Sequence, residues 1–117
     1  MPLPATVKAG YITYTVKQCT PDEWKNAVDK HLRDAYGVTQ HLPARILLHP
    51  DLTDDVARLT LWHEVLHAAI ETMTGGDDSQ WQGLTEGEAE EAVIRRLEHP
   101  TLSILRENPA LVAYLTG

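Results

Sequence analysis

The chain has 117 residues, of which 43% are hydrophobic and 23% charged, a balance typical of one globular domain. Its formal net charge is −7 and its ten Lys and Arg residues are scattered, which argues against a nucleic-acid partner. A single cysteine excludes an internal disulfide, and neither a leader pattern nor a membrane-length apolar run is present. We therefore expect one cytoplasmic domain over residues 1–117, without a membrane partner.

The first half of the sequence predicts two strands and one helix. Residues 11–16 alternate between β-favouring side chains, which predicts a strand with one buried face. Thr20-Pro21-Asp22-Glu23 has the pattern of a helix N-terminus, and apolar residues at helical spacing extend the expected helix to about Tyr36. The short apolar run from Ala44 to His49 ends before a proline and predicts the second strand.

The second half is expected to be helical. Thr53 and an acidic first turn begin the longest helix, whose apolar residues recur at helical spacing up to Gly75. A polar loop follows, and another helix is expected from about Thr85, with an interruption at Pro100. A last turn is expected over residues 110–115. The predicted fold class is α+β, with a small sheet packed against about three helices.

The motif His63-Glu64-Val65-Leu66-His67 lies in the middle of the longest predicted helix. Its spacing places both imidazoles on one helix face, close enough to bind one tetrahedral Zn²⁺ ion. Glu64 would project beside that ion and act as the general base that deprotonates a zinc-activated water. The motif predicts His63 and His67 as metal ligands and Glu64 as the catalytic residue of a zinc metallopeptidase. The alternative is two hydrogen-bonded histidines on a half-buried helix, with a solvated Glu64.

A catalytic zinc site also needs a third protein ligand. Glu71 lies two turns from His63, which is too far for the same ion. The remaining candidates are glutamates at the start of the next predicted helix. At 100° per residue, Glu86 and Glu90 lie nearest the apolar face of that helix, and Glu91 lies at its margin. This geometry slightly favours Glu90. For any single glutamate a solvated position favoured by the helix dipole is the better interpretation, but for the group as a whole it is not, because two histidines without a third protein ligand would make a poor zinc site.

These features resemble the gluzincin type of metallopeptidase, and in particular the short phage and prophage proteins related to the ImmA/IrrE metallopeptidases. The resemblance covers roughly Ala44 to Leu115 and includes residues 60–68, 90–94 and 105–112. It implies a minimal zincin-like core, with Zn²⁺ on His63 and His67 and with Glu64 as the base. The family pattern selects Glu91, not Glu90, as the third ligand. The Ala-Asn-x-Phe-Ala sequence that usually follows this ligand is missing, and so is a helix-turn-helix region.

The resemblance implies a protease, encoded by a phage or prophage, that hydrolyses a protein or peptide substrate in the cytoplasm of a bacterial or phage-infected cell. We expect the substrate to pair as an added strand with residues 44–49. Candidates for assisting the oxyanion are Tyr11, Tyr14, Tyr36, His41 and His49. The alternative function is a non-catalytic, zinc-stabilised structural or regulatory module that binds a partner. Activity that depends on Glu64 distinguishes the two, whereas the sequence leaves the oligomeric state open.

Overall fold

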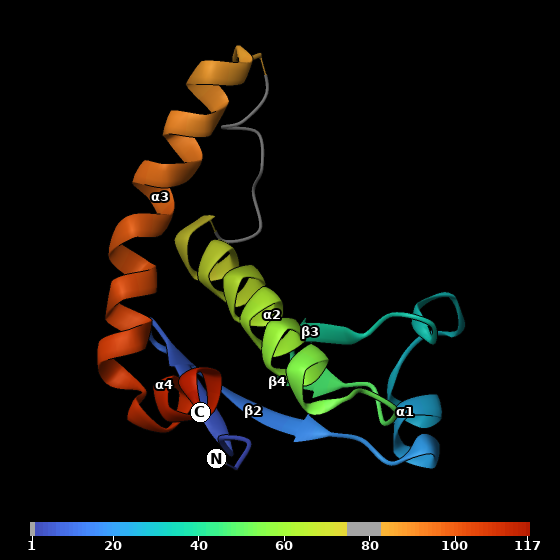
Figure 1. The fold of residues 1–117 in the computed structure, drawn as a ribbon. Helices are drawn as coiled ribbons and strands as arrows, with labels where there is room; N and C mark the ends of the chain where they lie inside the picture. The colour runs from blue at the N-terminus through green and yellow to red at the C-terminus, as the bar shows by residue number, and fades with distance from the viewer. Residues whose placement is uncertain (1, 75–82) are drawn as a thin grey trace.

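The computed structural model describes residues 2–74 and 83–117, and over these ranges the α+β class is confirmed (Figure 1). The strands are β1 (Thr6–Ala9), β2 (Ile12–Gln18), β3 (Gly37–His41) and β4 (Ala44–Leu48). The helices are α1 (Pro21–Ala27), the 3-10 helix η1 (Lys30–Leu32), α2 (Asp54–Thr74), α3 (Glu86–Glu107) and α4 (Pro109–Thr116). In these ranges no helix combines the length and the apolar character that crossing a bilayer requires.

The strands form one mixed sheet in the order β1-β2-β4-β3. β2 and β4 are parallel, and the other two pairs are antiparallel. β4 therefore has a partner on both sides, and its backbone has no free edge for a further strand. The prediction that a substrate pairs with residues 44–49 is wrong for this reason. β3 is the edge strand on this side of the sheet.

Three helices cover one face of the sheet. α2 crosses the strands, and α3 and α4 lie beside it, with the N-terminal part of α3 extending beyond the sheet (Figure 1). The buried residues Leu61, Val65 and Ala68 recur on one side of α2 and pack against strand residues such as Tyr14 and Ile46. Each large apolar side chain buried in this way stabilises the fold by about 1.5–3 kcal/mol. This packing fixes which side of α2 remains open to solvent.

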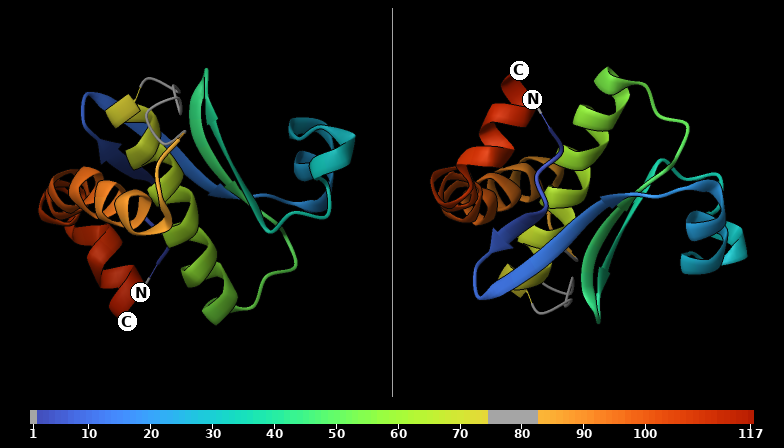
Figure 2. Two further views of the ribbon diagram at one scale, coloured as in Figure 1. Left: turned by 90° about the horizontal axis from the view of Figure 1, so that it is seen from above. Right: turned by 90° about the horizontal axis from the view of Figure 1, so that it is seen from below.

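α1 and η1 lie toward one end of the sheet, away from α3 and α4 (Figure 2). Trp24 and Val28 form a second apolar cluster there with Val38 and Leu47. The predicted helix to Tyr36 is wrong, because α1 ends at Ala27 and Val28 adopts an extended conformation. The chain turns at this point, and the indole of Trp24 donates a hydrogen bond to the carbonyl of Arg33 across the turn at 2.9 Å.

The structure departs from the sequence-based expectations in two further places. β1 and β3 are strands that the sequence did not predict. α3 runs without a break through Pro100, where an interruption was expected. Leu97 before the proline and Ile104 after it both pack against the main core. This packing on both sides of Pro100 offsets the backbone hydrogen bond that proline cannot donate.

The junction between α3 and α4 is joined to β1 by one buried polar side chain. The Asn108 amide donates to the carbonyls of Lys8 at 3.0 Å and Ile104 at 2.7 Å. Its oxygen accepts a hydrogen bond from the backbone N–H of Lys8 at 2.9 Å. The expected final helix is confirmed as α4, which begins just after this junction.

Candidate metal centre

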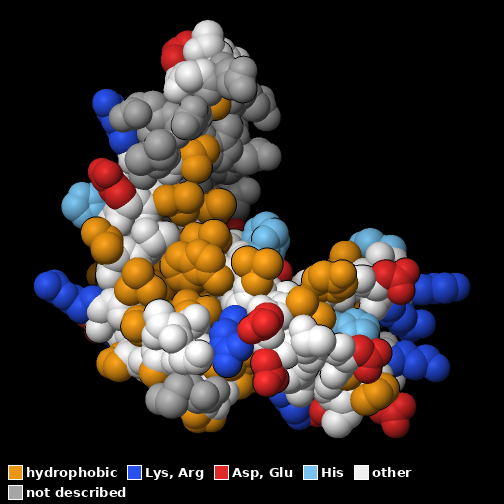
Figure 3. Space-filling model, in the orientation of Figure 1, with side chains coloured by type: hydrophobic (Ala, Val, Ile, Leu, Met, Phe, Trp, Pro, Cys, Tyr) orange, Lys and Arg blue, Asp and Glu red, His pale blue; other side chains and the backbone are white. Residues whose placement is uncertain are grey.

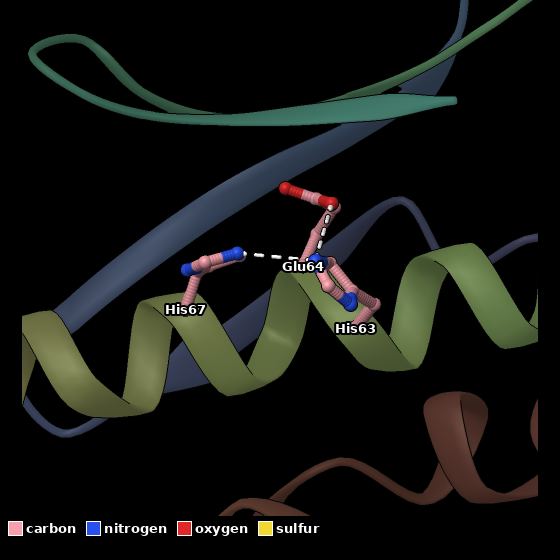
Figure 4. Close-up of side chains that lie close together, drawn as sticks. All are labelled: His63, Glu64 and His67. Carbon is pink, nitrogen blue, oxygen red and sulfur yellow. Dashed lines mark hydrogen bonds and ion pairs between the residues drawn. The ribbon is translucent and has the colours of Figure 1, made fainter. Parts of the chain in front are cut away.

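α2 carries His63, Glu64 and His67 within little more than one turn, and the potential ligand atoms of the three side chains lie within 4.8 Å of one another (Figure 4). The Nε2 atoms of the two histidines are 3.1 Å apart. Two nitrogens bound at about 2.0–2.1 Å to one tetrahedral ion would lie about 3.3–3.4 Å apart. The imidazole pair is thus close to the spacing that a shared Zn²⁺ ion requires, and a shift of a few tenths of an ångström would reach it.

The two histidines and the glutamate differ sharply in their exposure to solvent. The His63 side chain is 66% exposed and His67 is also exposed, so a metal and a water molecule could reach both imidazoles. The side chain of Glu64, in contrast, is only 7% exposed. It points from α2 toward the strands (Figure 4), whereas both imidazoles are exposed to solvent. The site therefore combines open ligand positions with one buried carboxyl group.

Glu64 is buried because β3 approaches α2 very closely at Gly37. A β-carbon placed on Gly37 would lie 2.8 Å from Cγ2 of Thr60 and 3.1 Å from Cγ of Glu64. Only a residue without a side chain allows this approach. Two positions further along β3, the Thr39 hydroxyl lies 2.9 Å from Oε1 of Glu64 and 3.1 Å from the Glu64 carbonyl oxygen.

The two carboxylate oxygens of Glu64 have different surroundings. Oε1 is within hydrogen-bonding distance of Thr39, as described above. Oε2 is 3.9 Å from Nε2 of His63, which is beyond a normal hydrogen bond. One oxygen is thus held by β3, and the other lies on the side of the His63 imidazole.

The predicted third ligands lie on α3, but the side chains of Glu86, Glu90 and Glu91 are outside the described part of the structure. Glu88 is exposed and forms a capping box with Thr85 at the start of α3. Glu71 is turned toward β3, where its Oε2 lies 3.8 Å from Nε2 of His41. Among the described side chains, two imidazoles could bind a metal ion, and one carboxylate lies beside them.

The candidates for an oxyanion-stabilising group differ in their position relative to His63 and in their burial. Tyr36 lines a hollow of about 320 Å³ together with His63 and Glu64, and is the best placed of them. Tyr14 is fully buried, and its hydroxyl is 2.9 Å from Nδ1 of His41. Burial and the nearby Glu71 carboxylate raise the pKa of Tyr14. His49 accepts a backbone hydrogen bond from Asp51 and contacts Trp24, which indicates a structural role. Tyr11 is fully exposed in the turn after β1.

An apolar surface adjoins this site. Hydrophobic side chains gather where α2, α3 and α4 meet (Figure 3). A hollow of about 340 Å³ in this region is lined by Arg58, Leu59, Trp62, Leu105 and Leu115. Leu59 is 71% exposed and lines both this hollow and the one beside His63. An apolar segment of another chain could contact this surface and the histidines together.

Sequence reasoning missed Gly37 and Thr39, the residues that surround Glu64. A signal was present, because Val38 and Thr39 favour strands and only the four residues 40–43 separate them from the strand that was predicted. A hairpin at this position would have placed an edge strand beside the predicted one. The contact of that strand with Glu64 is a tertiary feature that no local pattern encodes.

Comparisons with known protein families, with curated proteins and with solved structures find no match to this chain. The geometry of the imidazole pair has two physical interpretations. A separation of 3.1 Å suits a pair close to sharing a metal, and it equally suits an N–H···N hydrogen bond between two neutral imidazoles.

Proposed function

We propose that the protein is a zinc-dependent peptide hydrolase with a zincin-like core, in which His63 and His67 bind the metal and Glu64 is the general base. The observation that carries this proposal is the burial of the Glu64 side chain, only 7% exposed, beside two exposed imidazoles. Burying a carboxylate is unfavourable for folding unless its charge is compensated. A metal held by the imidazoles would supply that compensation, whereas a purely structural helix would favour an apolar residue here.

The third ligand in this proposal is Glu91, with Glu90 as the alternative. Both belong to α3, which packs beside α2. Single Glu91→Gln and Glu90→Gln variants distinguish them by their zinc content. We expect a large loss of zinc in the first variant and little change in the second. The opposite pattern would assign the role to Glu90.

The chemistry requires a base that takes a proton from the attacking water and returns one to the leaving amine. Zn²⁺, when bound, would lower the pKa of that water and polarise the substrate carbonyl. Glu64 would accept the water proton on Oε2, the oxygen that faces His63. It would then donate the proton to the nitrogen of the departing amine. Its near-complete burial excludes bulk water from the opposite side of the carboxylate.

Within residues 2–74 and 83–117, no strand pairs with the outer edge of β3, and this edge is the place where an extended substrate would pair. Alternate residues of an edge strand turn their N–H and C=O groups away from the sheet, where another strand can bind them. β3 lies against α2 at Gly37 and Thr39, so a peptide on its edge would pass over the histidines. Tyr36 and the exposed Leu59 beside this path favour an apolar side chain near the cleaved bond.

The experiment that tests this function is a Glu64→Gln substitution. The zinc-loaded wild type is incubated with a library of fluorogenic peptides, and rates are compared for peptides that it cleaves. We expect the variant to lose at least about 100-fold in kcat while keeping its zinc. Glu98→Gln, at an exposed position on α3, is the matched control and should cleave normally. A Glu64→Gln protein that cleaves at the wild-type rate would reject the role of Glu64.

One observation favours a second function, a zinc-stabilised module that binds a partner without catalysis. This observation is the apolar hollow formed by α2, α3 and α4, which resembles a docking surface as much as a substrate subsite. Under this alternative the protein would bind zinc but cleave none of the peptides. Glu64→Gln would then leave partner binding unchanged, since the hollow does not include Glu64.

A further inference from the structure

We propose that Thr39 is a positioning residue, which orients the Glu64 carboxylate for proton transfer. This inference rests on the proposed function, since it assigns Glu64 the role of base. Thr39 belongs to the edge strand β3 and Glu64 to α2, and the two residues are 25 positions apart in the sequence. The contact between them joins the strand that would pair with the substrate to the group that would act on it.

Thr39 has one hydroxyl proton and two acceptors within reach. The carboxylate oxygen Oε1 of Glu64 is 2.9 Å from Oγ1, and the backbone oxygen of Glu64 is 3.1 Å from it. The backbone oxygen lies inside α2, where the regular helix already provides a donor four residues later. A hydrogen bond to an ionised carboxylate is roughly twice as strong as one between neutral groups. The Thr39 proton should therefore go mainly to Oε1.

Because of this hydrogen bond, the two carboxylate oxygens of Glu64 have different roles. Thr39 occupies Oε1 from the side of the sheet, so the carboxyl group cannot rotate freely. Oε2 is then directed toward the imidazole of His63, whose Nε2 lies 3.9 Å away. The close approach of β3 at Gly37 keeps Thr39 within this distance. A fixed carboxylate reduces the reorganisation that proton transfer requires.

A purely structural role for Thr39 makes different predictions. In that case its hydroxyl would bind the backbone oxygen of Glu64 and hold β3 against α2. Removing it would loosen the edge strand and raise KM, because β3 is also the proposed substrate edge. Loss of positioning, in contrast, lowers kcat and leaves KM unchanged, since the substrate still binds but the base is misaligned.

The first test compares Thr39→Val and Thr39→Ser in peptide cleavage by the zinc-loaded protein. Thr39→Val keeps the shape of the side chain but removes the hydroxyl, and we expect kcat to fall by roughly 10–100-fold with unchanged KM and zinc content. Thr39→Ser restores the hydroxyl and should recover kcat to within about 3-fold of the wild type. Thr13→Val, at an exposed position of β2, is the matched control. A wild-type kcat in Thr39→Val, or a change in KM alone, would overturn the proposal.

The second test needs neither metal nor substrate. Thermal unfolding is measured for the metal-free wild type, Thr39→Val, Glu64→Met and the double variant. Glu64→Met keeps the backbone oxygen of residue 64 but removes the carboxylate. We expect Thr39→Val to lower Tm by roughly 3–5 °C in the wild type and by less than half of that shift in Glu64→Met. Equal shifts in both backgrounds would place the hydrogen bond on the backbone oxygen and overturn the proposal.

The two tests separate this inference from the proposed function. If the wild type cleaves no peptide, the proposed function fails, and the unfolding measurements still report whether Thr39 binds the Glu64 carboxylate. If the wild type cleaves peptides and Thr39→Val does so equally well, the function stands and the positioning role fails.

Discussion

The junction between α3 and α4 and the site around Glu64 each contain a buried polar side chain, but the two side chains differ in their hydrogen-bond partners. Asn108 is 9% exposed, and its amide group makes three hydrogen bonds, all to backbone groups of Lys8 and Ile104. Glu64 is 5% exposed as a whole residue, and its contacts are with a threonine hydroxyl and, at longer range, a histidine. Asn108 is neutral and fully paired, whereas Glu64 is ionisable and has one oxygen beyond hydrogen-bonding distance of His63.

This difference separates a structural polar residue from a candidate functional one. The hydrogen bonds of Asn108 to backbone groups stabilise the fold directly. A buried carboxylate with one hydrogen-bonded oxygen contributes little to stability, and it can lower stability when no cation is near. The comparison therefore predicts opposite effects when the two side chains are removed.

The largest expected effect on stability is that of Asn108→Ala. It leaves the N–H and C=O of Lys8 without their partner, and we expect a loss of about 2–3 kcal/mol in the free energy of unfolding. Glu64→Met in the metal-free protein should lie within about 1 kcal/mol of the wild type or be more stable. Urea denaturation followed by circular dichroism measures both. A Glu64→Met protein as unstable as Asn108→Ala would show that the two residues do not differ in this way.

Gly37→Ala tests whether the close packing of β3 on α2 controls the position of Glu64. The added β-carbon would lie within 3.2 Å of Thr60, Glu64 and the Leu47 carbonyl oxygen, so β3 and α2 must separate slightly. We expect a destabilisation of about 1–3 kcal/mol and a drop in kcat, because Thr39 moves with the strand. Gly87→Ala on α3, where the added atom meets nothing, is the control. Unchanged stability and unchanged cleavage in Gly37→Ala would contradict the close packing assigned to this position.

The smallest effect is expected at Glu23, whose charge is exposed at the surface. Its hydrogen bond with the Lys17 side chain, and then that with the Thr20 backbone, lower the Glu23 pKa from 4.5 to about 2. A lowered pKa in the folded state gives stabilisation that is present above about pH 4.5 and is lost as the pH falls toward 2. The Tm difference between wild type and Glu23→Gln should therefore be small at pH 7 and vanish near pH 2. A difference that grows on acidification would contradict this pKa.

Local patterns predicted α2 well and its surroundings poorly. The spacing of Val56, Leu59, Leu66 and Ile70 predicted α2 from sequence, and the spacing of His63 and His67 implies that they are neighbours. Both follow from helix geometry alone. The side of α2 that packs on the sheet carries Leu61, Val65 and Ala68 instead, and Leu59 is exposed. The end of α1 and the strand β3 depend instead on how Val28 and Val38 meet in one cluster, which involves residues distant in the sequence. The contact of Thr39 with Glu64 was unpredictable for the same reason.

The measurement that tests the central claim most directly is the zinc content of the purified protein by elemental mass spectrometry, for the wild type and for His63→Ala and His67→Ala. We predict about one zinc per chain in the wild type and a large loss in each variant, since each imidazole supplies one of the ligands. The His31→Ala variant, at an exposed position of η1, should keep the wild-type content. A wild-type protein without zinc after refolding with added Zn²⁺, or one whose zinc survives both substitutions, would contradict the proposed metal centre.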